Sequence, residues 1–289
     1  MGARDQTRTL LLLRHGQSTA NSEDIFSGWL DVPLSDRGRR EAVRAGELLA
    51  AYGPLPDVVH TSLLSRAIDT ANIALAVLDR QWLPTRRNWR LNERHYGALQ
   101  GRSRSAVRAE VGDAVFALWR RSYDHAPPPL AADDPPSARH ERRYAALPRR
   151  ELPTTESLAD VRARLLPYWQ DAVVDDLYAG RTTLLVAHGT SLRALCMHLD
   201  GLTPKEISTV NIPTGVPLRY DLDRDYRPRV RGGVYLDPES AAAGAAEVAA
   251  QGAPAADGTP HPPCALQMAE DVRLPAWRTA AGLPRRPAT

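Results

Sequence analysis

Apolar residues are concentrated in two short runs that lie roughly 170 residues apart along the chain. Leu10 to Leu13 are four consecutive leucines, and residues 182–187 form a second run that is rich in β-forming residues. Short continuous apolar runs are typical of strands covered by helices on both faces of a parallel sheet. Each run ends in a His-Gly pair, at His15 and at His188. We therefore predict two neighbouring strands whose carboxyl ends face one pocket.

Helical and strand-like patterns alternate in the intervals between these runs. Ser35 is a candidate N-cap for a helix that ends near Gly53, and residues 57–61 form a short strand candidate. Further helices are predicted from about residue 62 to 78, 105 to 121, 154 to 178 and 188 to 199, with strands near residues 82–89 and 216–221. This alternation favours an α/β protein with three layers, α/β/α, in which helices flank a mostly parallel central sheet.

The helix predicted over residues 105–121 has an apolar residue at every third or fourth position. The residues on this predicted inward face are Val107, Val111, Val115 and Leu118. The helix ends in Arg120 and Arg121. Consecutive helical residues point about 100° apart, so both arginines can face one ligand only if it sits at the helix end or in a fold-back.

Proline and alanine mark the segments that interrupt or follow this pattern. Residues 127–143 are proline-rich and aperiodic, which predicts a long loop or lid. Residues 232–251 are alanine-rich and favour a helix, whereas residues 252–289 combine proline and alanine without an apolar period. We therefore expect a single catalytic domain over residues 1–251 and a disordered extension over residues 252–289.

The composition excludes several classes of partner and site. The net charge of the 289-residue chain is +3 and its basic residues are scattered, so nucleic-acid binding is not supported. No apolar run approaches the ~20 residues of a membrane span or the length of a signal peptide, so we expect no membrane association and a cytoplasmic protein. Cys196 and Cys264 do not suggest a disulfide framework or a metal site, and Cys196 is expected to be a buried helix residue. No cluster of metal ligands is apparent.

Two arginines stand where an anion could bind. Arg14 and His15 follow the leucine run, and Gly16 permits a tight turn or a close approach of a ligand. Arg66 falls in the first turn of a predicted helix, where free backbone N–H groups also favour an anion. A cation and an imidazole at a strand end fit an anion-handling nucleophile. The alternatives are a surface turn at Arg14 and a solvated helix arginine at Arg66.

Glu93 lies in a glycine-bounded loop between residues 92 and 101, next to an arginine and close to a tyrosine. A carboxylate in this setting can form an ion pair or transfer protons. The residues alone leave both roles open.

Longer motifs resemble one known family. They are FSGW at residues 26–29, LNERHYGALQG at residues 91–101, WRR at residues 119–121 and NIPTGVPL at residues 211–218. Together with the two His-Gly pairs, they resemble the histidine phosphatase superfamily, and within it the cofactor-dependent phosphoglycerate mutases. The resemblance extends from about residue 10 to residue 251.

The resemblance implies roles for individual residues. Arg14, His15, Arg66, Glu93 and His188 match the family's catalytic set, in which His15 is the nucleophile, Arg66 holds the phosphoryl group and Glu93 transfers protons. The positions that match its substrate-binding residues are Asn21, Ser27, Gly28, Arg94, Tyr96, Arg104, Arg120, Arg121, Gly189 and Thr190. His95, in the same loop as Glu93, is interpreted as structural.

The resemblance also implies a reaction. A 2,3-bisphosphoglycerate primer would phosphorylate His15, and the enzyme would interconvert 3-phosphoglycerate and 2-phosphoglycerate without a metal ion. The expected partners are these small-molecule substrates and further copies of the chain, in a dimer or tetramer. The alanine-rich helix of residues 232–251 would cover the active site.

Three positions depart from the family pattern. Thr190 replaces an asparagine and could cap the following helix, Arg104 replaces a lysine, and Ala20 replaces a tryptophan, which could open space at the pocket mouth. The substitutions at positions 190 and 104 could favour transfer of the phosphoryl group to water instead of its retention on the intermediate. The alternative function is therefore a phosphohistidine-type phosphatase acting on a small phosphorylated metabolite, and a non-catalytic sensor of such metabolites is a third hypothesis.

Overall fold

The computed structural model describes residues 7–131 and 141–253. In this part of the chain, six strands form one sheet in the order β3-β2-β4-β1-β5-β6. Their bounds are β1 Arg8–Arg14, β2 Val58–Thr61, β3 Thr85–Arg87, β4 Thr183–Ala187, β5 Leu218–Leu222 and β6 Val234–Tyr235. The pairs β1–β4, β2–β4 and β2–β3 are parallel, whereas β5 pairs antiparallel with β1 and with β6. The predicted, mostly parallel central sheet is confirmed.

The two apolar runs of the sequence are adjacent strands. Leu10 of β1 pairs with Thr183 of β4, and Arg14 pairs with Ala187. The His15 N–H continues the ladder by donating to the Ala187 carbonyl at 3.0 Å. In-register parallel pairing therefore brings the two His-Gly pairs to the same edge of the sheet.

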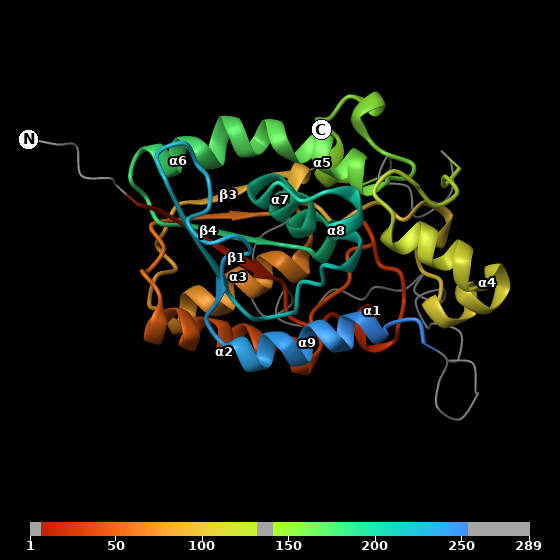
Figure 1. The fold of residues 1–289 in the computed structure, drawn as a ribbon, viewed down its shortest axis with the longest axis horizontal. Helices are drawn as coiled ribbons and strands as arrows, with labels where there is room; N and C mark the ends of the chain where they lie inside the picture. The colour runs from red at the N-terminus through yellow and green to blue at the C-terminus, as the bar shows by residue number, and fades with distance from the viewer. Residues whose placement is uncertain (1–6, 132–140, 254–289) are drawn as a thin grey trace, which may run out of the picture.

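Helices cover both faces of the sheet (Figure 1), because successive leucines of β1 point to opposite sides. Leu10 and Leu12 pack against α5 (Leu158–Tyr168), α6 (Val174–Tyr178) and α7 (Gly189–Asp200). Leu11 and Leu13 pack against α2 (Asp36–Tyr52) and α3 (Ser65–Val77). All four leucines are at most 1% exposed. The three-layer arrangement is confirmed.

The helix predicted from about residue 154 to 178 is shorter at its start and interrupted in the middle. It begins at Leu158, where Ser157 and Asp160 form a capping box. Pro167 lies inside α5 and has no N–H to donate, and a π-helical turn over Trp169–Val173 follows before α6.

The prediction of a single inward face on α4 (Arg104–Arg121) is wrong for its second half. Val107 is fully buried, but Val115 is 38% and Leu118 is 40% exposed, and Phe116 is buried instead. The cause is Gly112, whose φ of 79° breaks the helix into two segments and changes the phase of the apolar stripe.

The last described helix, α9 (Pro238–Ala250), confirms the helix expected over residues 232–251. It runs beside α2 in Figure 1, and Arg37 of α2 forms a 2.7 Å ion pair with Glu247 of α9. The short helices α1 (Thr19–Ser22) and α8 (Pro204–Thr209) were not predicted from the sequence. Short 3₁₀ turns occur at Trp89–Leu91, Gly97–Leu99, Arg142–Tyr144 and Arg149–Glu151.

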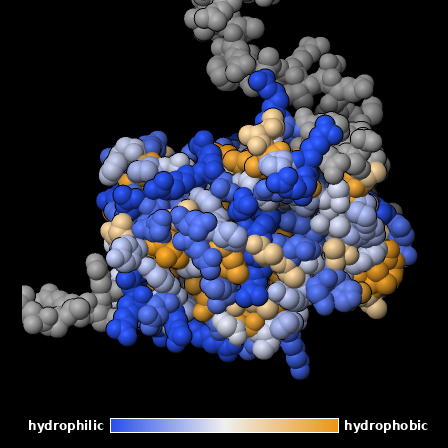
Figure 2. All heavy atoms as spheres, turned by 90° about the horizontal axis from the view of Figure 1, so that it is seen from above, coloured by the Kyte–Doolittle hydropathy of each residue, from blue (hydrophilic) through white to orange (hydrophobic). Residues whose placement is uncertain are grey.

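Two expectations fall largely outside the described residues. They are the central part of the lid over residues 127–143 and the extension over residues 252–289. On the face shown in Figure 2, hydrophilic residues are spread over the surface, with hydrophobic residues between them. Within the described ranges, no helix is long and apolar enough to cross a bilayer.

Candidate active site

His15 lies at the carboxyl end of β1 and is held in one orientation. Its side chain is only 3% exposed, and its Nδ1 lies 2.7 Å from the Gly16 carbonyl oxygen. Because a carbonyl only accepts, Nδ1 carries the proton and Nε2 carries the free lone pair. A Cβ on Gly16 would lie 2.2 Å from the Gly38 carbonyl, so only glycine allows this approach of the β1 end to the first turn of α2.

Burial and two arginines keep the His15 ring neutral. Burial is the largest cause that lowers the pKa of His15 well below its ordinary value, and Arg66 and Arg14 lower it further. A neutral imidazole with a free Nε2 is a nucleophile that remains active below the usual histidine pKa.

His188 begins α7 as its N-cap residue and lies against His15, with the two ring centroids 4.9 Å apart. Its Nε2 is 2.8 Å from Ser62 Oγ, and that oxygen also accepts from the Leu64 N–H at 3.2 Å. Its Nδ1 is buried and has no partner among the described residues. Burial, followed by Arg66 and His15, lowers the pKa of His188 well below its ordinary value.

Glu93 is held by backbone donors of two segments. Its Oε1 accepts from the Arg94 N–H at 2.7 Å and from the Thr190 N–H at 3.1 Å. The carboxylate is 8% exposed and lines the same pocket as His15. Thr190 lies in the first turn of α7, and His188 is the N-cap of the same helix. The start of α7 therefore positions both His188 and, through the Thr190 N–H, Glu93.

Except for Arg104, the arginines of the site form no ion pair with a carboxylate of the described residues. Arg14 donates to the Ile212 carbonyl, and Arg66 donates to the carbonyls of Leu30 and Gly28. The arginines of the site that form no salt bridge within the described residues are Arg14, Arg66, Arg94, Arg120, Arg121 and Arg193. Buried cations without counter-ions are costly, so the pocket is built for an anion.

The pocket brings together most of the residues predicted from the sequence. The residues that line it are Arg14, His15, Asn21, Ser27, Glu93, Tyr96, Arg104, Arg120, Arg121, Gly189, Thr190, Arg193, Asn211, Ile212, Val248 and Gln251.

Four predicted residues lie behind this lining. Arg66, fully buried in the first turn of α3, and His188 lie behind His15. Gly28 contributes its carbonyl to Arg66 at 2.7 Å. Arg94 places its guanidinium 4.6 Å from the centroid of the Tyr96 ring, which itself lines the pocket.

Arg120 and Arg121 reach the pocket from the end of α4. This is one of the two arrangements in which consecutive helical arginines can face a single ligand. Arg120 donates to the carbonyls of Val248 and Gln251, both at 2.6 Å, and so binds the end of α9. Arg121 donates to Asn211 Oδ1 at 2.7 Å. The two arginines therefore bind different segments of the chain.

The structure places each of the three departures from the family pattern. Thr190 does not cap α7, because His188 occupies that position, and its side chain hydrogen-bonds with Tyr96. Arg104 lines the pocket and forms a 3.2 Å ion pair with Asp24. Ala20 does not open the pocket mouth, because it is buried in an apolar cluster away from the lining.

The sequence interpretation missed Ser62, Arg193, Asn211 and Gln251. Ser62 directly follows β2, so its place at a strand end could have marked it. Arg193 lies four residues after Gly189 and therefore on the same face of α7. His95, interpreted as structural, is 1% exposed and accepts the Gly97 N–H at its Nδ1.

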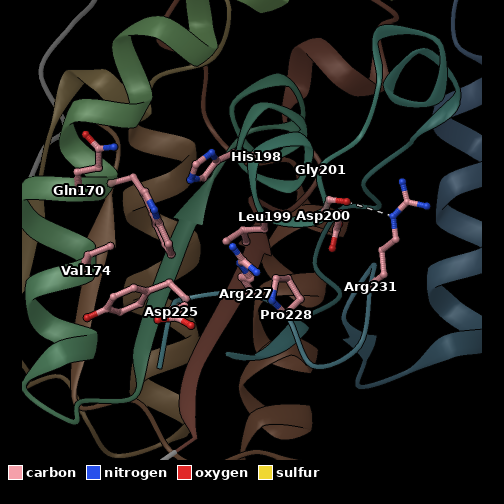
Figure 3. A pocket seen from close by; sticks show the side chains of 12 residues that line it. Gln170, Val174, His198, Leu199, Asp200, Gly201, Asp225, Arg227, Pro228 and Arg231 are labelled. Atoms are coloured by element: carbon pink, nitrogen blue, oxygen red, sulfur yellow. Dashed lines mark hydrogen bonds between the residues drawn. The ribbon is translucent and has the colours of Figure 1, made fainter. Parts of the chain in front are cut away.

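The pocket is small, with a volume of about 60 Å³, which holds only a few water molecules. A larger cavity of about 700 Å³ lies between the π-helical turn, the end of α7 and the loop after β5 (Figure 3). Its lining includes Arg231, which binds the Asp200 carbonyl and Glu206, but none of the residues that the sequence marked as catalytic or substrate-binding. The chemistry therefore identifies the smaller pocket as the site. In the described residues, no group of three or more His, Cys, Asp or Glu could hold a metal ion.

The α/β fold, with His15 and His188 at the ends of adjacent strands and several arginines without an ion pair in the described residues, is the arrangement expected of a histidine phosphatase. In agreement, the family model described as "Histidine phosphatase superfamily (branch 1)" matches residues 10–227. Among solved structures, the chain is similar to a mycobacterial glucosyl-3-phosphoglycerate phosphatase, with a TM-score of 0.59 and 29% identity over 77% of this chain and 96% of that one.

Curated relatives narrow the class. The chain is 59% identical over 247 residues to the 2,3-bisphosphoglycerate-dependent phosphoglycerate mutase of Clavibacter sepedonicus, covering 86% of this chain and 98% of the relative. It is 59% identical over 233 residues to the protein of the same name from Thermobifida fusca, covering 81% and 94%. The chain therefore belongs to the histidine phosphatase superfamily and, within it, to the 2,3-bisphosphoglycerate-dependent phosphoglycerate mutases.

Proposed function

We propose that the protein interconverts 3-phosphoglycerate and 2-phosphoglycerate through a phosphorylated His15, primed by 2,3-bisphosphoglycerate. The observation that carries the proposal is the pairing of a neutral, oriented His15 with buried arginines that have no counter-ion within the described residues. The names of the relatives support the substrate, and the geometry supports the role of each residue.

The unpartnered donors fit a bisphosphate. Nε of Arg14, Nε of Arg66 and Nδ1 of His188 have no hydrogen-bond partner in the described part of the chain, and all three groups are close to His15. Nε of Arg94 and Nε of Arg193 are also unpartnered, on the side of Tyr96 and Arg121. Two groups of donors suit a ligand with an anion at each end, and the bisphosphate would supply the phosphoryl group that primes the enzyme.

Phosphoryl transfer begins with His15. Its Nε2 lone pair attacks the phosphorus of the ester, while Arg14 and Arg66 neutralise charge on the equatorial oxygens. The P–N bond forms as the P–O bond to the leaving alkoxide breaks. In the second half of the cycle, the phosphoryl group passes from His15 to the free hydroxyl of a bound phosphoglycerate. The P–N bond breaks as the new P–O bond forms, and the bisphosphate is formed again.

Ser62 assigns the proton of His188. Ser62 Oγ accepts from the Leu64 N–H, and His188 Nε2 is the one acceptor for its proton among the described residues, so we assign the hydroxyl as the donor to His188 Nε2. His188 then carries its own proton on Nδ1, the unpartnered nitrogen. It acts as a neutral donor to a phosphoryl oxygen in the transition state.

Glu93 transfers the proton. It protonates the leaving alkoxide and later removes the proton from the attacking hydroxyl, which typically contributes ~10²–10⁴-fold to the rate. Its hydrogen bonds to the Arg94 and Thr190 N–H groups fix one oxygen and leave Oε2 more weakly bound, at 3.4 Å from Thr190. We assign proton transfer to Oε2.

Access to the site requires motion, because the pocket is too small for a phosphoglycerate. The end of α9 closes it, with Val248 and Gln251 in the lining and both carbonyls bound by Arg120. Release of these hydrogen bonds would open the pocket. We further propose that the enzyme works in the cytoplasm as a dimer or tetramer.

Turnover of 3-phosphoglycerate with and without added 2,3-bisphosphoglycerate tests the function, with 2-phosphoglycerate and free phosphate measured in the same reaction. Formation of 2-phosphoglycerate that depends on the primer, without phosphate release, is the expected result. Release of phosphate without 2-phosphoglycerate would replace the mutase by the phosphatase alternative. The structural similarity to a phosphatase and the threonine at position 190 are the observations that favour this second candidate.

A further inference from the structure

Arg193 is a buried arginine of the pocket to which the sequence analysis assigned no role. It lies in α7, one turn after Gly189, and both residues line the pocket. Its side chain is 6% exposed. Nη2 donates to the Ile207 carbonyl at 2.7 Å, and this is its one hydrogen bond to the described residues. Nε is buried and has no partner among them. Most of its fork of donors is therefore available to a ligand.

The charges around Arg193 require an anion. Burial, followed by Arg121 and Arg94, lowers the pKa of Arg193 to about 10, whereas Tyr96 and Glu93 act in the opposite direction. No carboxylate among the described residues forms an ion pair with any of these three arginines. Burying Arg193 and Arg94 beside the half-buried Arg121 without an ion pair is costly, so a bound anion is expected to balance these cations.

Arg193 belongs to a different part of the site from the arginines at His15. The cations that act most strongly on His15 are Arg66 and Arg14, whereas those that act on Arg193 are Arg121 and Arg94. Arg120 is the other candidate for a distal anion, but its guanidinium is bound to α9 carbonyls. Arg121 and Arg193 therefore remain for the group at the far end of the substrate.

We propose that Arg193, together with Arg121, binds the carboxylate of the phosphoglycerate and so restricts the site to phosphate esters that carry a second anion. The planar guanidinium matches a carboxylate with two parallel hydrogen bonds, which a lysine cannot provide. The proposal rests on the proposed function. It adds Arg193, a residue to which the resemblance assigns no role, to the residues that recognise the carboxylate.

Two ligands that differ only at this group test the proposal. In 3-phosphoglycerate a carboxylate stands where glycerol 3-phosphate has a hydroxymethyl group. Dissociation constants of both are measured calorimetrically for the wild type, Arg193→Gln and Arg193→Lys. Inorganic phosphate is a third probe, which needs only the donors at His15. Arg162→Gln is the matched control, because Arg162 also has a buried, unpartnered Nε and one hydrogen bond, to Tyr123, but lies outside the pocket.

We expect Arg193→Gln to weaken 3-phosphoglycerate at least about tenfold, with glycerol 3-phosphate and phosphate changed less than about twofold. Arg193→Lys should recover only part of the loss, and Arg162→Gln should change none of the three constants. An equal loss for all three ligands would show a structural role, and no loss would exclude a contact; either result overturns the proposal. Wild-type turnover distinguishes failure of this inference from failure of the proposed function. If the wild type forms 2-phosphoglycerate but Arg193→Gln leaves the dissociation constants unchanged, the proposed function stands and only the role of Arg193 is excluded.

Discussion

Two clusters of buried charge in this molecule are built in opposite ways. In one, Asp176 accepts hydrogen bonds from Arg86, Arg181 and His60, at distances between 2.6 and 3.1 Å. In the other, the pocket at the ends of β1 and β4, Arg14 and Arg66 lie close to His15, and four further arginines of the site likewise form no ion pair in the described residues. The first cluster satisfies itself, whereas the second is complete only with an anion.

The comparison separates structural from functional charge. In the Asp176 cluster, burial raises the pKa of the carboxyl, but hydrogen bonds from Arg86, Arg181 and His60 outweigh it, so the pKa lies below its ordinary value. The ion pair is therefore part of the folded state. At the site, arginines and a histidine are buried with donors that have no partner among the described residues. Their desolvation is not compensated by hydrogen bonds in the folded protein, so hydrogen bonds to a ligand can compensate it and favour binding.

The largest expected effect concerns the nucleophile. His15→Ala removes the nitrogen that receives the phosphoryl group, so turnover should fall at least about 10⁴-fold. The free energy of unfolding should fall only slightly, because the contact of the buried ring with His188 and its hydrogen bond to the Gly16 carbonyl are lost. Coupled assays and urea unfolding check the two parts. Residual turnover above this limit would place the nucleophile elsewhere.

Glu93→Gln should lower kcat by ~10²–10⁴-fold, equivalent to about 3–5 kcal/mol of transition-state free energy, with little change in KM. The amide keeps the shape and an oxygen acceptor for the Arg94 and Thr190 N–H groups but cannot transfer a proton. Steady-state kinetics measures both constants. A rise in KM without a fall in kcat would make Glu93 a binding residue.

Stability should fall with acid because buried histidines stay neutral in the folded state. Burial, followed by Arg164, lowers the pKa of His95 to about 4, against an ordinary value of 6.5 in the unfolded chain. Between pH 6.5 and about 4 the unfolded chain binds more protons, so the free energy of unfolding decreases as pH falls, by up to about 1.4 kcal/mol per pH unit for this residue. Urea unfolding at several pH values in this window measures the free energy of unfolding, which should depend less steeply on pH in His95→Asn than in the wild type. An unchanged pH dependence would exclude His95 as a cause of the acid destabilisation.

Asp176→Asn should lower stability without lowering turnover, whereas the variants of the site lower turnover. It removes the charge that pairs with Arg86, Arg181 and His60, which should cost about 2–3 kcal/mol of unfolding free energy, since both arginines are half exposed. Turnover of the folded enzyme should not change. Thermal unfolding and kcat at a temperature well below the midpoint check this. A loss of kcat would connect this cluster to the site and break the comparison.

The smallest expected effect is that of Ser62→Ala. It removes the hydroxyl that orients His188, and kcat should fall about tenfold because the proton on Nδ1 is no longer fixed. Ser62→Thr keeps the hydroxyl and should restore most of the rate. Equal losses in both variants would indicate a packing effect instead.

The strands and the catalytic end of the sheet could be predicted because their signals are local. Four leucines and a His-Gly pair identify β1, and the same pattern identifies β4. Positions that depend on other segments could not be predicted in this way. Arg193 becomes a pocket residue only because α7 shares the pocket lining with the end of α4, a segment distant in sequence. Val115 and Leu118 are exposed because Gly112 adopts a positive φ, which a hydrophobic period cannot reveal.

The hydrogen bonds from Arg120 to the carbonyls of Val248 and Gln251 have a kinetic consequence. Terminal turns of helices open and close on nanosecond to microsecond timescales, far faster than typical turnover. Opening of α9 alone therefore does not set how long a bisphosphate stays bound. The ligand would leave only when α9 opens and the donors that bind the two anionic ends of the ligand release it at the same time. Because both must occur together, the residence time of the bisphosphate is longer than the opening of α9 alone would allow, and a helix end held by a few hydrogen bonds can retain an intermediate through its reorientation.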